Sequence, residues 1–119
     1  MEKPARNWAS KREQKAQTMK KIEHLLDGKY VPTETIIEVL ETVIQPGDKV
    51  VLEGDNQKQA SFLSKSLEQV NTDKVNQLHM IMSSISRPEH LTIFEKGIAA
   101  KIDFSYAGAQ STRVAQMIE

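Results

Sequence analysis

The fold is decided by the stretch Gln45-Pro46-Gly47-Asp48-Lys49-Val50-Val51-Leu52-Glu53-Gly54-Asp55-Asn56. Pro46 and Gly47 favour a turn, because both residues interrupt regular structure. The apolar run Val50-Val51-Leu52 that follows is typical of a buried strand, and a polar loop begins at Glu53. We therefore expect a strand near residue 50 whose carboxyl end opens into that loop.

Helical and strand-like segments alternate on both sides of this stretch. Apolar residues recur at helical spacing, with Ile36, Ile37, Leu40, Val43 and Ile44 before it and Ala60, Leu63, Leu67 and Val70 after it. Further strands should start near residues 78 and 102, with a helix between them that begins at Pro88. Gaps of this length leave room for crossover helices, so the strands should be parallel. The sequence predicts an α/β fold, an open parallel sheet with helices on both faces, preceded by an N-terminal helical arm.

The charge of the chain is divided unevenly between two parts. The 119 residues include 16 basic and 16 acidic side chains, and this balance argues against a generic polyanion such as nucleic acid as partner. Residues 1–29 have a net charge of +4, which leaves −4 for the remainder. We therefore separate a basic N-terminal helical arm, residues 1–30, from an α/β part, residues 31–119. The arm suits an anionic surface or a partner subunit, or it packs as a solvated helix along one edge of the domain.

Composition also excludes several kinds of protein. No apolar run approaches the roughly 20 residues of a membrane span, and the basic opening lacks the apolar stretch of a secretory signal. The chain has no cysteine, which excludes disulfides, a catalytic thiol and thiolate metal sites, and fits a reducing compartment. The spacing of the three histidines suggests no metal site. We expect a soluble, cytoplasmic protein.

Polar side chains gather after each of the three predicted strands. Ligands of an open parallel sheet bind beyond the carboxyl ends of the strands, where residues 53–59, 83–87 and 105–108 would converge. Backbone N–H groups and side-chain amides of the first cluster could hold a carboxylate or a thioester carbonyl. A simple helix cap with solvated neighbours is an equally good interpretation. Glu53 could act as an acid or base, without a partner that the sequence identifies, and His79 should face a covered side of the sheet, bonded to a backbone carbonyl.

The segment from Gln45 to Ala60, with its string Gly54-Asp55-Asn56-Gln57-Lys58-Gln59-Ala60, resembles the amino-terminal part of malonate decarboxylase alpha subunits. The likeness covers roughly residues 33–108 and continues through Leu78-His79-Met80, Arg87-Pro88-Glu89-His90-Leu91, Phe94-Glu95-Lys96-Gly97-Ile98-Ala99 and Ile102-Asp103-Phe104-Ser105-Tyr106. The wider relatives are the family I CoA-transferases, whose third strand ends in a Ser-Tyr-x-Gly segment that residues 105–108 match.

The resemblance implies a transferase subunit that exchanges acetyl for malonyl on an acyl-carrier-protein thioester during malonate decarboxylation. The carrier's CoA-like prosthetic group would hold the acyl group, and no cofactor would bind to this chain directly. The resemblance implies roles in substrate binding for Gly54, Asn56, Gln57 and Gln59, and a place at the cleft for Ser105, Tyr106 and Gly108. No catalytic residue is expected here, because the glutamate that attacks the thioester in the CoA-transferases lies beyond Glu119.

The subunits of this family are several times longer, so the resemblance implies a fragment that folds but does not catalyse the exchange. Its expected partners are the acyl carrier protein, the other malonate decarboxylase subunits, and malonate or acetate. Neither nucleic acid nor a membrane is expected, and exposed sheet edges leave self-association into a homo-oligomer open. The alternative function is a non-catalytic α/β interaction module that docks partner subunits through its basic helix and exposed apolar surface.

Overall fold

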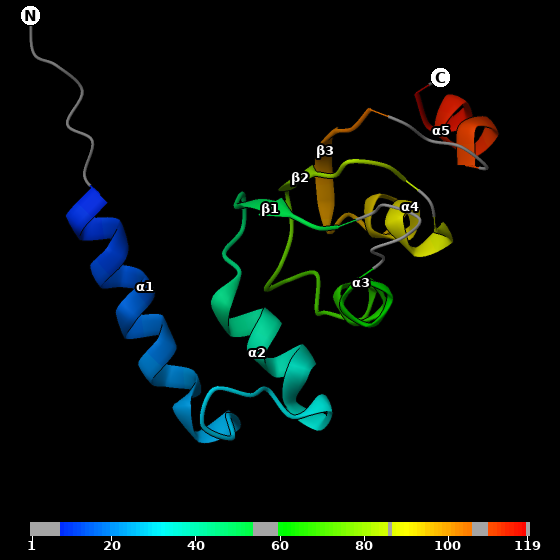
Figure 1. The fold of residues 1–119 in the computed structure, drawn as a ribbon. Coiled ribbons are helices and arrows are strands. Elements are labelled where there is room, and N and C mark those ends of the chain that lie inside the picture. The colour runs from blue at the N-terminus through cyan, green and yellow to red at the C-terminus, as the bar shows by residue number, and fades with distance from the viewer. Residues whose placement is uncertain (1–7, 54–59, 86, 106–109, 119) are drawn as a thin grey trace, which may run out of the picture.

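The structure, a computed structural model, describes residues 8–53, 60–85, 87–105 and 110–118. Five α-helices, two short 3-10 helices and three strands follow one another along these residues (Figure 1). Their bounds are α1 Trp8–Ile22, η1 Glu23–Leu25, η2 Thr33–Thr35, α2 Ile36–Val43, β1 Lys49–Val51, α3 Ser61–Glu68, β2 Leu78–Ile81, α4 Pro88–Glu95, β3 Ala99–Asp103 and α5 Ser111–Ile118. The predicted alternation of helix and strand is confirmed, including the helix that begins at Pro88.

The three strands form one parallel sheet in the order β1-β2-β3. Val50, Met80 and Ile102 lie side by side across it, so their side chains point to the same face. The register shifts by one residue between Leu78 and His79, where β2 pairs with β3. Such an irregularity adds local twist without ending the pairing.

Helices α2, α3 and α4 pack on a single face of the sheet. The core between the helices and the sheet contains residues from α3, β2, α4 and β3 together with residues that connect the elements: Leu52, Leu67, Val70, Val75, Leu78, Met80, Met82, Ile93, Ile98 and Ala99. Leu78 and Met80 have no exposed surface, and side chains of α2 pack against the same cluster. Burial of these apolar side chains is the main driving force for the fold.

The opposite face of the sheet carries polar and exposed side chains. Lys49, His79 and Lys101 lie in register across it, and Val51 at the edge is 77% exposed. The open parallel sheet, its flanking helices and the leading helix are thus confirmed, but the helices of the described residues do not cover this second face. The reason is the strand order, since consecutive strands joined by crossovers of one hand place both connecting helices on the same face.

Helix α1 lies beside α2, away from the sheet (Figure 1). Ile22, in its last turn, is its one buried residue. The ammonium group of Lys15 reaches the carbonyl oxygen of Val43 at 3.2 Å and Asp48 Oδ2 at 3.4 Å. The expected N-terminal helix therefore packs along one edge of the domain through few contacts.

Candidate functional site

The three chain segments that leave the carboxyl ends of the strands are hydrogen-bonded to one another. The Ser83 hydroxyl, beyond β2, donates to Glu53 Oε1, beyond β1, at 3.0 Å. The Ser105 hydroxyl, beyond β3, donates to the carbonyl oxygen of Ser83, and the Ser105 N–H group points to the same oxygen at 3.4 Å. Glu53, Ser83 and Ser105 thus mark one polar edge of the sheet, where an open parallel sheet binds its ligands.

The chain leaves this edge at Glu53 and returns to it at Ala60. The Ala60 N–H group donates to the Glu53 carbonyl oxygen at 3.3 Å. The N–H group and the hydroxyl of Ser64, in the first turn of α3, donate in turn to the Ala60 carbonyl oxygen, at 2.8 and 2.7 Å. Glu53 and Ala60, the described residues on either side of positions 54–59, therefore lie next to each other at the polar edge, close to the start of α3.

Most of the predicted site residues belong to segments that the structure leaves undescribed. Gly54, Asn56, Gln57 and Gln59 lie outside the described residues, and so do Tyr106 and Gly108. Ser105 is described and exposed, and it lies at the carboxyl edge as expected. Its hydroxyl is engaged by the Ser83 carbonyl, which indicates that it fixes the ends of β2 and β3.

Glu53 contributes a carboxylate to this polar edge. Its carboxylate is exposed and is oriented by the hydrogen bond from the Ser83 hydroxyl. The sequence alone did not identify Ser83 as the hydrogen-bond partner of Glu53. Glu53 and Ser83 each follow the buried residue that ends an apolar run, Leu52 and Met82, but only the strand order of the structure shows that β1 and β2 are neighbours.

His79 has a different partner from the expected one. It lies on the face of the sheet away from the helices, and its Nε2 atom is 2.7 Å from Asp103 Oδ2. The expectation of a backbone carbonyl on a covered face was therefore wrong. Alternation along β2 does place His79 opposite Met80, but the sequence does not reveal that this second face stays open.

The second polar cluster, residues 83–87, is followed in the first turn of α4 by a buried histidine, His90. Arg87 precedes α4, and its N–H group donates to His90 Nδ1 at 3.3 Å. His90 has no exposed surface, and burial lowers its pKa below the usual 6.5, an effect that Glu89 opposes and Arg87 reinforces. An Nδ1 atom that accepts a hydrogen bond carries no proton, so the neutral imidazole fits this position.

Metal-ligand clusters and membrane-spanning helices are both absent from the residues that the structure describes. These residues contain no group of three His, Asp or Glu side chains placed to hold a metal ion. No helix among them is long and apolar enough to cross a membrane.

An open parallel α/β sheet with a polar edge beyond the carboxyl ends of its strands is typical of ligand-binding α/β domains. Within that class the chain belongs to the family described as malonate decarboxylase, alpha subunit, transporter, whose sequence pattern matches residues 7–119.

Individual relatives are similar over most of this chain. It is 47% identical over 92 residues to the acetyl-S-ACP:malonate ACP transferase of Malonomonas rubra, a match that covers 77% of this chain and 17% of that protein. The crystal structure of a malonate decarboxylase alpha subunit from Acinetobacter baumannii superposes with a TM-score of 0.90 at 57% identity, covering 93% of this chain and 21% of that one. The crystal structure of a Pseudomonas malonate decarboxylase hetero-tetramer in complex with malonate gives a TM-score of 0.90 at 50% identity. This match covers 97% of this chain and 21% of the matched one.

The chain thus spans about a fifth of the length of these relatives, between 17% and 21%. The likeness establishes the family and the fold of this part.

Proposed function

We propose that this chain is part of a transferase subunit that exchanges acetyl for malonyl on an acyl-carrier-protein thioester. The observation that carries the proposal is the 47% identity to a protein named acetyl-S-ACP:malonate ACP transferase, over 77% of this chain. The polar edge formed by Glu53, Ser83 and Ser105 supports it, since an acyl thioester and a dicarboxylate need polar partners in a cleft.

The proposed reaction is a balanced acyl exchange. Acetyl-S-carrier and malonate give malonyl-S-carrier and acetate, so one thioester bond breaks and another forms without any oxidant or reductant. The CoA-like prosthetic group of the carrier supplies the thiol, and no cofactor bound to this chain is needed. The role of this chain is to bind and orient, while the nucleophilic glutamate implied by the CoA-transferase relatives belongs to a more distant part of the subunit. On its own, the 119-residue chain should therefore not catalyse the exchange.

We assign substrate binding to Gly54, Asn56, Gln57 and Gln59, and a place at the cleft to Ser105, Tyr106 and Gly108. The position of Glu53 and Ala60 at the polar edge, on either side of this segment in the sequence, supports the first group. Side-chain amides of that segment would stabilise negative charge that develops on a thioester oxygen. The position of Ser105 supports the second group.

The paired substitution Asn56→Ala and Gln57→Ala, made in the complete subunit, tests the first assignment. Loss of an oxyanion donor typically lowers kcat by roughly 100-fold or more, so we expect a large fall in malonate transfer. Lys58→Ala in the same segment is the matched control and should retain the rate. An unchanged rate in the paired variant would show that these side-chain amides do not contact the acyl group.

The remaining features follow from the same proposal. Residues 1–30 form an arm, and residues 31–119 form the first portion of a CoA-transferase-like domain. The partners are the acyl carrier protein and other subunits of a malonate decarboxylase complex, in the cytoplasm. The hetero-tetramer of the Pseudomonas relative supports the multisubunit setting. The complete subunit, given acetyl-S-carrier and isotopically labelled malonate, should place label on the carrier, and the absence of label would contradict the proposed function.

A further inference from the structure

Helix α1 has a net positive charge on a surface that contributes little to the core. Its 15 residues include five basic side chains and one acidic one, a net charge of +4 in a chain whose total is zero. Only Ile22 is buried, while Trp8 and Met19 are 62% and 47% exposed. The residues that the structure describes thus leave most of the surface of this helix uncovered.

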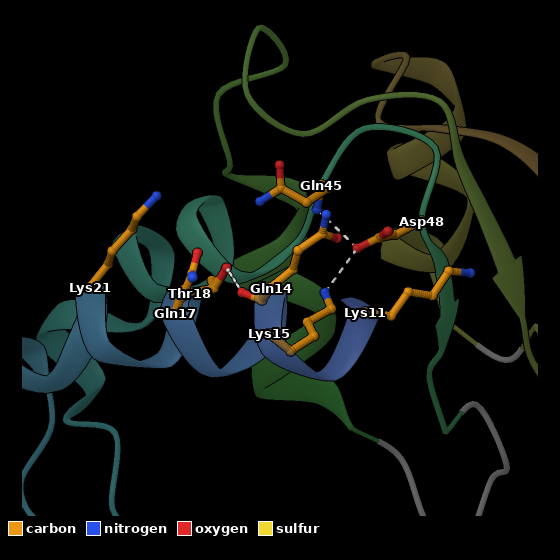
Figure 2. A pocket seen from close by; sticks show the side chains of 8 residues that line it. All are labelled: Lys11, Gln14, Lys15, Gln17, Thr18, Lys21, Gln45 and Asp48. Atoms are coloured by element: carbon orange, nitrogen blue, oxygen red, sulfur yellow. Dashed lines mark hydrogen bonds and ion pairs between the residues drawn. The ribbon is translucent and has the colours of Figure 1, made fainter. Parts of the chain in front are cut away.

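One side of α1 forms the wall of a polar groove of about 530 Å³ (Figure 2). Six residues of α1 line it, among them Lys11, Lys15 and Lys21, and the turn before β1 closes it with Gln45 and Asp48. All eight lining side chains are charged or polar. The groove therefore offers hydrogen bonds and charge, with no apolar pocket for an anchoring side chain.

The lysines that line this groove differ in whether they form an ion pair. Asp48 Oδ2 is 3.4 Å from Lys15 Nζ and also accepts the Gln45 N–H group at 3.0 Å. Lys15 is thereby held in place with its charge compensated. Lys11 and Lys21 are exposed and form no ion pair with any residue that the structure describes. Two uncompensated cations remain, ten residues apart and so about 15 Å apart along the helix.

The groove does not belong to the polar edge that we propose for substrate binding. Asp48 precedes β1 and Glu53 follows it, and five residues of extended chain span about 15 Å. The groove thus lies at the amino end of the strand, and Glu53 at its carboxyl end. A ligand in the groove does not share the site of the acyl exchange.

We propose that this groove, with Lys11 and Lys21, docks the acyl carrier protein through carboxylates on the carrier's surface. The proposal rests on the proposed function, which makes the carrier a substrate that must bind and leave in each turnover. Lysine ammonium groups in a groove without apolar anchors suit such a partner, because they steer association and are weakened by salt while adding little lasting affinity. The rise of about 15 Å along the helix between the two lysines exceeds the size of a single phosphate group and suits several acidic residues on a protein face.

The test uses the complete subunit and the carrier protein without its prosthetic group. Lys11→Glu with Lys21→Glu should weaken binding of this carrier by roughly tenfold at low salt, because two attractions become repulsions. Arg12→Glu with Lys20→Glu is the matched control on the same helix, with the same change in charge outside the groove. It should weaken binding far less, and high salt should reduce the difference between the two variants.

The steady-state kinetics of the exchange reaction distinguish the docking proposal from the proposed function. With the loaded carrier, the groove variant should raise KM by a similar factor and leave kcat unchanged, since the polar edge is untouched. Wild-type carrier affinity in the groove variant, or equal losses in both variants, would overturn the docking site while exchange itself continues. An effect seen only with the carrier that holds its prosthetic group would also overturn it, in favour of the phosphates of that group. Absence of exchange in the wild-type subunit would instead overturn the proposed function.

Discussion

The Nε2 atom of His79 lies 2.7 Å from Asp103 Oδ2, which joins β2 to β3 on the face of the sheet that no described helix covers. The pairing is diagonal, because His79 stands opposite Lys101 and Asp103 is two residues further along β3. His79 is 17% exposed and Asp103 is 62% exposed. The second face of the sheet thus carries an ordered polar contact between its two longer strands.

Asp103→Ala should cost little stability, and the loss should be specific to this contact. Since one partner is largely exposed, we expect a fall of about 0.5 kcal/mol in the free energy of unfolding, measured with urea. Lys101→Ala, on the same strand and face, is the control and should lie closer to wild type. Equal losses in both variants would show that the pair with His79 adds nothing.

His90 should make the stability of the fold depend on pH. Burial lowers its pKa in the folded state below 6.5, whereas the unfolded chain takes up the proton at about its ordinary pKa of 6.5. The unfolded state therefore binds more protons than the folded state as the pH falls, and the free energy of unfolding should decline as the pH is lowered through about 6.5 towards the folded-state pKa. His90→Gln should flatten this decline in urea unfolding across that range.

The exposed His24 provides the matched comparison. His24→Gln should keep the decline of the wild type. If His90→Gln and the wild type decline in parallel, the histidine that titrates on unfolding is a different one.

Truncation of a side chain should lower the free energy of unfolding strongly only on the face of the sheet that the helices cover. Met80 has no exposed surface and packs among the helices, so Met80→Ala should lower the free energy of unfolding by about 2–5 kcal/mol. Val51 lies on the neighbouring strand, is 77% exposed and points to the other face. Val51→Ala should therefore change the free energy of unfolding by less than about 0.5 kcal/mol. Comparable losses at the two positions would mean that both faces are packed.

Ser105 should stabilise the polar edge through its hydroxyl. Ser105→Ala removes the bond to the Ser83 carbonyl, so we expect a loss of about 1 kcal/mol in unfolding free energy. Ser105→Thr retains a hydroxyl and should recover most of it. A threonine variant as unstable as the alanine variant would show that the hydroxyl does not fix the two strand ends.

The sequence was informative wherever structure depends on local pattern. Alternating periodicities located the helices and strands, and the apolar run at Val50 marked the first strand, because each of these signals is contained within a few residues. The parallel arrangement followed from the distances between strands along the chain. The start of the helix at Pro88 could likewise be read directly.

Contacts between distant residues could not be read in this way. The partner of Glu53 is Ser83, 30 residues away, and their approach depends on the order and register of β1 and β2. The partner of His79 and the open second face depend on which elements cover the sheet, which no periodicity in β2 encodes. The position of α1 depends on contacts such as that of Lys15 with Asp48, 33 residues apart.

The intact mass of the carrier protein tests the central claim most directly. Acetyl-S-carrier is incubated with malonate and the complete subunit, and mass spectrometry follows the carrier with time. The proposed exchange predicts a product heavier by one added carboxyl group, with free acetate released in equal amount and no such product from the 119-residue chain alone. A carrier that keeps its acetyl mass in the presence of the complete, folded subunit would contradict the account.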